Sequence, residues 1–214
     1  MVGCIGSYEE RKAQSLLLKA AKKLIDDGRL PNIHCLLVGE GPDKEMLTGL
    51  IDELGIGAHV SLCDFTKEPF YVFERCNVIA LPSTGKEGLP NVLLEALAME
   101  KPCVAHPLAP PCHTPSPGRT TLTLRRPHAA YYRCVATNKY GMPEVVIDGK
   151  TGYVFPSGDV DALADAIVKI GGVSAEEQAK MAAAGKEMVF AEHDKVKQFE
   201  KILEIIKAKA RGAL

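Results

Sequence analysis

The sequence predicts an α/β fold: a Rossmann-like, doubly wound parallel sheet with helices on both faces. Two observations carry this prediction. Short apolar segments alternate along the chain with longer amphipathic segments. Each apolar segment is also nearly continuous, as expected of a strand that helices cover on both faces. Such alternation is typical of a parallel sheet, in which ligands bind at the carboxyl ends of the strands.

The elements alternate from the N-terminus onward, starting with the apolar segment 2–6 and the amphipathic segment after it. Strands are expected near 2–6, 33–39, 59–63, 77–81, 102–105 and 152–155. Helices are expected near 12–27, 43–54, 68–76, 90–99, 159–170, 174–190 and 194–210. This arrangement places Gly6, Gly39 and the glutamates of segment 87–95 at the carboxyl edge of the sheet.

Single residues indicate where two of these helices begin. Pro90 suits the first helical position, where its missing N–H would have no partner in any case. Asp159 precedes an apolar run and is interpreted as a helix N-cap. Asp159 and Asp161 superficially form a metal-binding D-x-D. Because the cap explains Asp159 better, we predict no catalytic metal.

Composition is that of a globular domain. The 214 residues are 46% hydrophobic, enough for one core. The net charge of −1 gives no electrostatic reason to expect nucleic acid or an anionic membrane as a partner. No apolar run reaches the roughly 18 residues of a membrane span, and the N-terminus lacks a signal-peptide pattern. Seven cysteines without a C-x-x-C pair predict reduced thiols and a cytoplasmic location.

Two glutamates flank the start of one predicted helix, in the segment Glu87-Gly88-Leu89-Pro90-Asn91-Val92-Leu93-Leu94-Glu95. Glu87 lies before the helix and Glu95 about one and a half turns inside it. The residues around Glu95 are nearly all apolar, so its ionised carboxylate needs hydrogen-bond donors. Ribose hydroxyls would serve, and the helix N-terminus suits a diphosphate. On spacing and polarity alone, the simpler interpretation is that Glu95 reaches solvent or pairs with a lysine.

Segment 87–95 closely resembles the E-x7-E motif of retaining GT-B glycosyltransferases, especially glycosyltransferase family 4 (group 1). Other motifs of that family occur before and after this segment, in the same order along the chain as in the family. They are Val2-Gly3-Cys4-Ile5-Gly6 with Lys12, Gly39-Glu40-Gly41-Pro42, Asn77-Val78-Ile79-Ala80-Leu81-Pro82-Ser83, Gly141-Met142-Pro143-Glu144 and Asp148-Gly149-Lys150-Thr151-Gly152. The resemblance implies that residues 1–214 are the C-terminal, donor-binding half of a GT-B fold, without its N-terminal acceptor domain.

The resemblance also implies a role for each matching residue. Glu87 and Lys12 are the expected catalytic residues: Glu87 would contact the donor sugar and Lys12 would neutralise its diphosphate. Glu95 would bind the ribose. The other expected donor-binding residues are Gly88, Leu89, Pro90, Asn91, Gly6, Ser7, Arg11, Gly39, Asp64 and Phe65. Retaining transfer of this kind is generally framed as front-face attack, so no protein nucleophile is expected. No cofactor is expected either, because the nucleotide-sugar donor is a substrate.

The chain departs from the family at two positions. Ser7 stands where the family usually has an arginine, and Ala13 where it has a glycine. A serine cannot replace the bidentate phosphate contact of an arginine, and Arg11 is a candidate to compensate. Asp64 and Phe65 follow the third predicted strand, where the family contacts the nucleobase mostly through backbone. An ordinary strand-ending turn explains these two residues equally well.

Segment 106–136 does not fit the family pattern. It holds 6 of the 14 prolines and no acidic residue. Cys103-Val104-Ala105 recurs as Cys134-Val135-Ala136, and deleting 106–136 restores an uninterrupted family-like sequence. We interpret the segment as a translated intron or gene-model error, or else as a real inserted loop that is largely disordered. The spacing of Cys112, His113, His128 and Cys134 is too irregular to indicate a zinc site.

Three functions fit these observations. The first is transfer of a hexose from a UDP- or GDP-sugar to an acceptor glycan, lipid or small molecule, with this chain as the donor-binding half and inactive alone. The second is a non-catalytic nucleotide-sugar-binding module or the donor subunit of a split enzyme. The third is a structural or interaction protein with a degenerate site.

The last predicted helix is a candidate surface for binding a partner protein. It carries an apolar stripe of Val196, Phe199, Ile202, Leu203 and Ile206. This stripe would either pack on the protein's own sheet or bind a second copy or a separate N-terminal acceptor domain.

Overall fold

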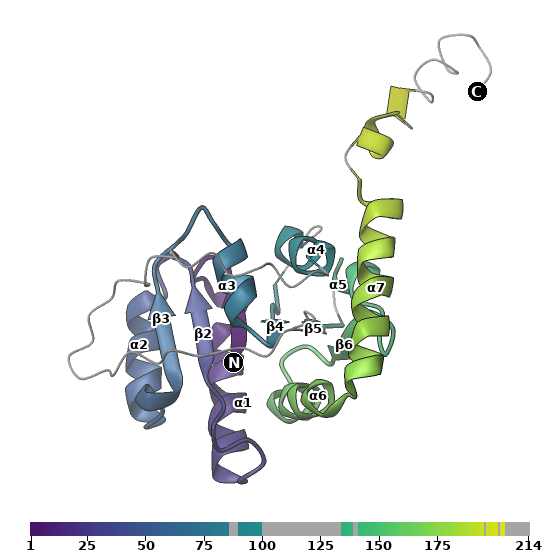
Figure 1. Cartoon of the computed structure of the whole chain (residues 1–214). Coiled ribbons are helices and arrows are strands. Elements are labelled where there is room, and N and C mark those ends of the chain that lie inside the picture. The colour runs from purple at the N-terminus through teal and green to yellow at the C-terminus, as the bar shows by residue number, and fades with distance from the viewer. Residues whose placement is uncertain (86–89, 100–133, 139–140, 195, 201, 204–214) are drawn as a thin grey trace.

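The computed structural model describes residues 1–85, 90–99, 134–138, 141–194, 196–200 and 202–203. These residues form a parallel six-stranded sheet in the order β3-β2-β1-β4-β5-β6 (Figure 1). The strands are β1 Val2–Ile5, β2 Cys35–Val38, β3 Val60–Cys63, β4 Val78–Leu81, β5 Cys134–Thr137 and β6 Gly152–Phe155. The order reverses between β1 and β4, which is the switch point of a doubly wound sheet. The predicted Rossmann-like fold is confirmed.

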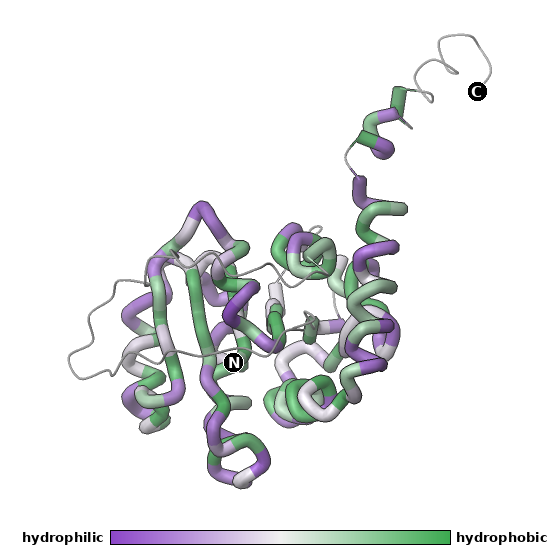
Figure 2. Tube along the Cα trace, in the orientation of Figure 1, coloured by the Kyte–Doolittle hydropathy of each residue, from purple (hydrophilic) through white to green (hydrophobic). Residues whose placement is uncertain are grey.

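Helices cover both faces of the sheet because successive strand side chains point to opposite faces. On β4, Val78 and Ala80 belong to one core, and Ile79 and Leu81 to the other. The first core includes side chains of α1 (Gln14–Asp26), α2 (Lys44–Glu53) and α6 (Val160–Gly172). The second includes side chains of α3 (Phe70–Arg75), α4 (Asn91–Ala98), α5 (Met142–Val145) and α7 (Ala175–Glu192). Figure 2 shows β2 as hydrophobic between these layers.

The fifth strand corrects a prediction. The sequence placed a strand at 102–105 and assigned 134–136 to the insertion. In the structure Cys134–Thr137 forms β5, whose Cys134, Val135 and Ala136 pair with Ile79, Ala80 and Leu81. Deleting 103–133 leaves the same sequence as deleting 106–136, so the repeated Cys-Val-Ala cannot show from sequence which copy enters the sheet. Residues 102–105 lie outside the described residues, as do Cys112, His113 and His128.

Most predicted helices are present within two residues of their expected ends. Asp159 is the N-cap of α6, as predicted: its carboxylate accepts a hydrogen bond from the Ala162 N–H at 2.9 Å. Asp161 of the same D-x-D pairs with Lys23 at 3.3 Å. Three short elements of the described chain were not predicted, namely α5 and the 3-10 turns Glu10–Lys12 and Gly57–His59. Of the last predicted helix, 196–200 and 202–203 are helical, and 204–210 lie outside the described residues.

The cysteines of the described chain are packing residues. Cys4, Cys35, Cys63, Cys76 and Cys134 are all buried, and none of them forms a disulfide. Burial raises the pKa of Cys4, Cys35 and Cys134 to about 12, so these three sulfurs remain thiols at neutral pH.

Candidate functional site

The sheet opens at its switch point. β1 and β4 are paired only through Val2–Val78 and Gly3–Ile79, although the strands continue to Ile5 and Leu81. Their carboxyl ends therefore diverge. A cavity of about 440 Å³ lies there, which we call the switch-point pocket. Three walls line it, one following β1, one following β4 and one following β3.

The first wall consists of Ile5, Gly6 and Lys12. The Gly6 N–H donates to the Val38 carbonyl at 3.0 Å, which continues the β1–β2 pairing by one residue. The 3-10 turn Glu10–Lys12 then brings Lys12 back to the pocket. The aliphatic carbons of Lys12 lie against Gly6, and its side chain is half-buried. An ammonium held at this place would attract an anionic ligand.

Ala13 follows Lys12 in the left-handed region, with φ 51° and ψ 40°. It links the 3-10 turn to α1. In this region a Cβ is strained, and glycine is the residue that adopts it without cost. The geometry supplies a physical reason for the glycine that the resembling family has here.

The second wall follows β4 and consists of Leu81, Pro90, Asn91, Val92 and Glu95. Pro90 is the N-cap of α4 rather than its first residue, one position from the prediction. Because α4 buries Leu93, Ala96 and Leu97 in the core, Glu95 lies on the opposite, exposed face, where it borders the pocket. Pro90, Asn91 and Val92 at the start of α4 border the same cavity, so the positive end of the helix lies beside it.

Packing against α7 fixes the position of α4. Gly185 of α7 is buried opposite Leu97 of α4, where an added Cβ would lie 2.6 Å from a Leu97 methyl. The glycine allows the two helices to approach closely, and Glu95 is carried on the far side of α4.

The third wall follows β3 and consists of Phe65, Thr66, Lys67 and Pro69. Buried Tyr8 connects it with the first wall, because the Tyr8 hydroxyl donates to the Cys63 carbonyl at 2.6 Å. Burial raises the pKa of Tyr8, so the hydroxyl remains a donor. The exposed Asp64 pairs with Lys44 of α2 and does not line the pocket.

Gly39 and Gly41 hold the loops that follow β1 and β2 together. A Cβ on Gly39 would overlap the carbonyl oxygen of Gly6, and one on Gly41 would overlap that of Tyr8. The backbones are joined directly, since the Tyr8 N–H donates to the Glu40 carbonyl at 2.8 Å. Gly39 does not line the pocket. Its local role is to allow the backbone after β2 to approach the backbone after β1, which carries the first wall.

Gly39→Ala is expected to lower the free energy of unfolding by about 2 kcal/mol, because the new methyl displaces the Gly6 carbonyl. Gly49→Ala is the control, since Gly49 lies in α2 with open space around it. That change is expected to raise the free energy of unfolding by roughly 0.5–1 kcal/mol. Urea unfolding followed by circular dichroism measures both. Equal effects of the two substitutions would show that Gly39 is not a close-packed backbone position.

The remaining predicted site residues lie elsewhere. Ser7 and Arg11 are engaged with Glu9, and a hydrogen bond from Ser7 and another from Arg11 hold the pKa of Glu9 below its ordinary value. The Arg11–Glu9 ion pair measures 2.6 Å. Neither Ser7 nor Arg11 lines the pocket. Glu87, Gly88 and Leu89 lie outside the described residues.

The described residues contain no group of three or more His, Cys, Asp or Glu side chains able to hold a metal ion. No helix in the same residues has the length and apolar character needed to cross a membrane.

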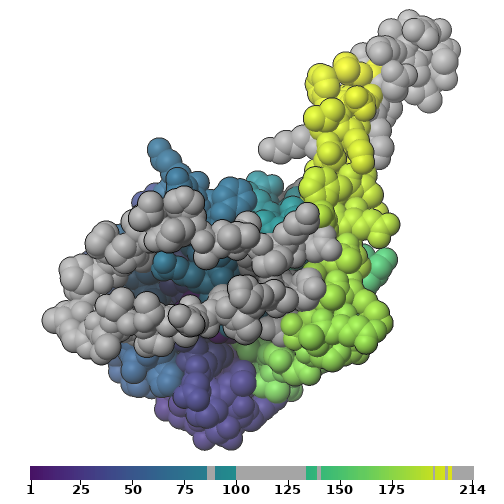
Figure 3. Space-filling view, in the orientation of Figure 1, coloured from purple at the N-terminus to yellow at the C-terminus, as the bar shows by residue number. Residues whose placement is uncertain are grey.

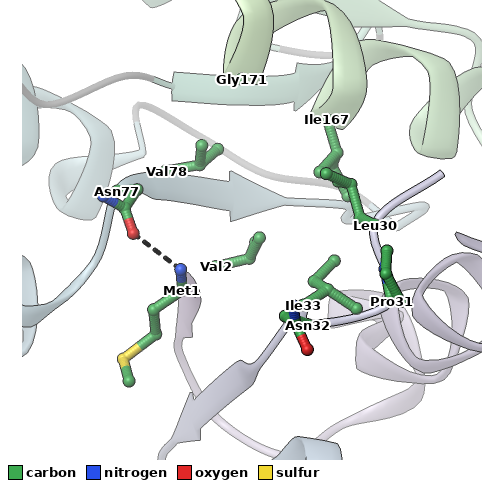
Figure 4. A pocket seen from close by; sticks show the side chains of 10 residues that line it. All are labelled: Met1, Val2, Leu30, Pro31, Asn32, Ile33, Asn77, Val78, Ile167 and Gly171. Atoms are coloured by element: carbon green, nitrogen blue, oxygen red, sulfur yellow. Dashed lines mark hydrogen bonds between the residues drawn. The ribbon is translucent and has the colours of Figure 1, made fainter. Parts of the chain in front are cut away.

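A second cavity, of about 350 Å³, lies at the amino-terminal edge of the sheet (Figure 4). Leu30, Ile33, Val78 and Ile167 contribute apolar side chains to it. The Met1 ammonium at its margin donates to the Asn77 carboxamide oxygen at 2.7 Å. Of the described residues that line it, none is an aspartate, glutamate, histidine, lysine or arginine. The charged side chains Lys12, Lys67 and Glu95 belong instead to residues that line the switch-point pocket.

Comparison with known proteins identifies the family. A family model described as "Glycosyl transferases group 1" matches residues 1–125 and 127–188. A GDP-mannose-dependent alpha-(1-6)-phosphatidylinositol monomannoside mannosyltransferase of Mycolicibacterium smegmatis is 30% identical over 78% of this chain. An uncharacterized glycosyltransferase of Methanocaldococcus jannaschii is 32% identical over 47% of it. The matched regions span only 37% and 24% of those two proteins.

Solved structures share the fold. Alr3699/HepE of Anabaena, in complex with UDP, matches 97% of this chain and 48% of its own with a TM-score of 0.74 and 19% identity. The C-terminal domain of the group 1 family protein LpcC from Francisella tularensis matches 91% of this chain and 86% of its own, with a TM-score of 0.65 and 16% identity.

Proposed function

The chain belongs to the glycosyl transferases group 1 family, and we propose that its switch-point pocket binds the nucleotide-sugar donor of a retaining hexosyl transfer. One observation carries the proposal: Lys12, the N-terminus of α4 and Glu95 border the same cavity. A cation and a helix N-terminus suit a diphosphate, and a carboxylate suits ribose hydroxyls.

In the proposed reaction the pocket stabilises the departing nucleoside diphosphate. As the bond between the sugar and the diphosphate breaks, negative charge grows on the diphosphate, which Lys12 and the first amides of α4 would bind. Glu95 would hold the ribose. Glu87, which lies outside the described residues, would contact the donor sugar, as the family resemblance implies. The proposal involves no metal or cofactor and assigns no nucleophile to the protein.

The proposed donor is a UDP- or GDP-hexose. The mycobacterial relative is named as GDP-mannose-dependent, and the structure of the Anabaena protein contains UDP. Both ligands share the nucleoside diphosphate that the pocket is proposed to bind. We propose that the acceptor is bound by a separate part of a complete enzyme, because the chain spans less than half of each of these proteins.

Calorimetric titration of UDP, GDP and ADP tests the proposal on two proteins: the full chain and a variant lacking 103–133. One of the nucleotides is expected to bind the deletion variant. Binding to that variant but not to the full chain would show that the extra segment obstructs the pocket. If the deletion variant is folded by circular dichroism and binds none of the three, the donor-site proposal is wrong and the third function, an interaction protein, takes its place.

An exposed apolar stripe near the C-terminus indicates that the chain binds another protein. Phe190, Val196, Phe199 and Ile202 are all exposed, and Phe199 is 61% exposed. They lie on the end of α7 and the helical residues after it, which project beyond the rest of the described chain (Figures 1 and 3). Val196, Phe199 and Ile202 of the predicted stripe therefore do not pack on the protein's own sheet, whereas Leu203 is half-buried and Ile206 lies outside the described residues. We propose that it binds an acceptor domain or, in the isolated chain, a second copy.

Self-association of the isolated chain is expected to depend on this stripe. Val196→Ser with Phe199→Ser should lower the molar mass that light scattering measures at high protein concentration, because burial of both apolar side chains in the dimer is lost. Met46→Ser is the control, since Met46 is exposed on α2, away from the stripe. A monomeric wild-type chain, or a dimer unaffected by the double change, would contradict the self-association.

A further inference from the structure

The loops that follow β1 and β4 meet again beyond the point where the two strands diverge. The strands pair only over the first two residues of each. Farther along the chain, the Arg11 carbonyl accepts two hydrogen bonds from the loop after β4. One comes from the Thr84 N–H at 2.9 Å and the other from the Gly85 N–H at 3.1 Å. We call this contact the Arg11 clamp.

The clamp holds the tip of a loop whose base is already fixed. Buried Gln14, at the start of α1, donates from its carboxamide to the Ser7 carbonyl at 2.8 Å, which ties the two ends of the loop after β1 together. The 3-10 turn uses the carbonyls of Glu9 and Glu10 for its own hydrogen bonds, whereas that of Arg11 accepts from the loop after β4. The loop after β4 therefore determines where this tip lies.

Gly85 allows the contact because it has no Cβ. A Cβ built on Gly85 would overlap the Cβ of Arg11 and would lie 3.2 Å from its Cα. The backbone of Gly85 is outside the left-handed region, so the position requires space and not an unusual conformation. The overlapped atom is the root of the Arg11 side chain, which cannot swing aside as the guanidinium could. A side chain at position 85 would therefore move the backbone of the turn.

Lys12 is the residue that such a movement would carry with it, because it follows Arg11 in the same turn. Its half-buried side chain lies against Gly6 and lines the switch-point pocket, whereas Arg11 and Gly85 do not line it. Ala13 comes next, with φ 51°, and a non-glycine residue keeps this strained conformation only where its surroundings hold it. Because a charge-assisted contact depends on where the ammonium lies, a shift of the turn would weaken the diphosphate site without removing any group that touches the ligand.

We propose that Gly85 is a positioning residue for the diphosphate site: it seats the Arg11 carbonyl on the loop after β4 and thereby fixes the place of the Lys12 ammonium. The inference rests on the proposed function, because it takes the ligand to be a nucleoside diphosphate. The groups that would bind the diphosphate follow β1 and β4, and the clamp is a direct backbone contact between these two segments.

Calorimetric titration with UDP and UMP tests the role of Gly85 in the full chain, or in the variant lacking 103–133 where only that variant binds. GDP and GMP replace them if GDP is the nucleotide that binds. Gly85→Ala is expected to weaken UDP binding by about 10-fold and UMP binding by less than about twofold, because the displaced ammonium contacts the diphosphate. Gly57→Ala is the control and should leave both affinities as they are, since Gly57 lies in another 3-10 turn with open space around it.

Two further backgrounds show whether Gly85 acts through the clamp and through Lys12. In Arg11→Gly the atom that the new methyl would overlap is absent, so Gly85→Ala should weaken UDP binding to that variant by about twofold or less. In Lys12→Met the effect of Gly85→Ala should likewise be about twofold or less, because the displaced side chain has already lost its charge. A general loosening of the fold would weaken UDP binding by the same factor in all three backgrounds.

The outcomes separate this inference from the proposed function. Equal weakening of UDP and UMP by Gly85→Ala, or an undiminished loss in Lys12→Met, would overturn the positioning role and leave the proposed function intact. If Gly85→Ala alone fails to fold, recovery of folding and of UDP binding on adding Arg11→Gly supports the clamp, and no recovery contradicts it. If neither the full chain nor the variant lacking 103–133 binds UDP or GDP, the proposed function is wrong, and the positioning role with it.

Discussion

Glu95→Gln is expected to weaken binding of UDP or GDP by about 10- to 100-fold, the loss of one or two hydrogen bonds to a charged acceptor. Glutamine preserves the length of the side chain but removes the charge. The fold should be unaffected, since Glu95 is exposed and α4 is anchored through Leu93, Ala96 and Leu97. Isothermal titration calorimetry measures the change, and Glu144→Gln is the matched control, since Glu144 is an exposed residue of α5 outside the pocket.

A ligand without ribose hydroxyls identifies the contact. In the wild-type chain, 2′,3′-dideoxy-UDP should bind about 10- to 100-fold more weakly than UDP. In Glu95→Gln the two ligands should bind with nearly equal affinity, because the group that tells them apart is gone. If the dideoxy ligand loses the same factor in both proteins, the ribose is bound by another residue and the role proposed for Glu95 is wrong.

Lys12→Met is expected to weaken binding of the diphosphate by a similar factor. Methionine keeps the aliphatic contact with Gly6 but not the charge. Loss of a charge-assisted contact should weaken UDP binding by about 10- to 100-fold and reduce the advantage of UDP over UMP. Lys22→Met is the control, because Lys22 pairs with Asp26 on α1, away from the pocket.

The salt dependence of binding checks the same assignment. Raising the ionic strength should weaken UDP binding to the wild-type chain more than to Lys12→Met, since screening acts on the charge that the variant lacks. If Lys12→Met retains the full UDP-to-UMP ratio, the diphosphate is not at Lys12.

The fold was predictable because its signal is local. Buried parallel strands such as Cys35–Val38 and Val78–Leu81 are continuous apolar runs, and amphipathic helices separate them. The fifth strand was not assigned correctly, since its three leading residues occur twice. Only pairing with β4 and β6 distinguishes Cys134–Thr137 from the earlier copy. The four-residue α5 was missed because one turn has no periodicity to detect.

The candidate site was predictable in part. One cavity is bordered by Gly6, Lys12, Phe65, Pro90, Asn91 and Glu95, although they come from three separate segments that follow β1, β3 and β4. Four other predicted residues lie at the same edge of the sheet but do not line the cavity, namely Ser7, Arg11, Gly39 and Asp64. The reason is that the position of a residue after a strand does not determine the direction of its side chain. Arg11 turns to Glu9, and Asp64 turns to Lys44.

Lys67 was missed for a related reason. A lone lysine in a polar loop is normally a solvated surface residue. The one signal in the sequence was the position of Lys67 two residues after Phe65. That position indicates a pocket residue only once the loop after β3 is known to form a wall of the pocket. Long-range placement of this kind depends on strand order, in which β3 and β4 lie on opposite sides of β1.

Amide chemical-shift mapping with the preferred nucleotide tests the central claim most directly. A ¹H–¹⁵N titration of the labelled chain locates the ligand without relying on any substitution. The pocket at the switch point predicts saturable shifts at Gly6, Lys12, Asn91 and Glu95, with little change at Asn32 and Asn77 beside the amino-edge cavity. Saturable shifts confined to Asn32 and Asn77, or shifts that do not saturate anywhere, would contradict the assignment of the donor to the carboxyl edge of the sheet.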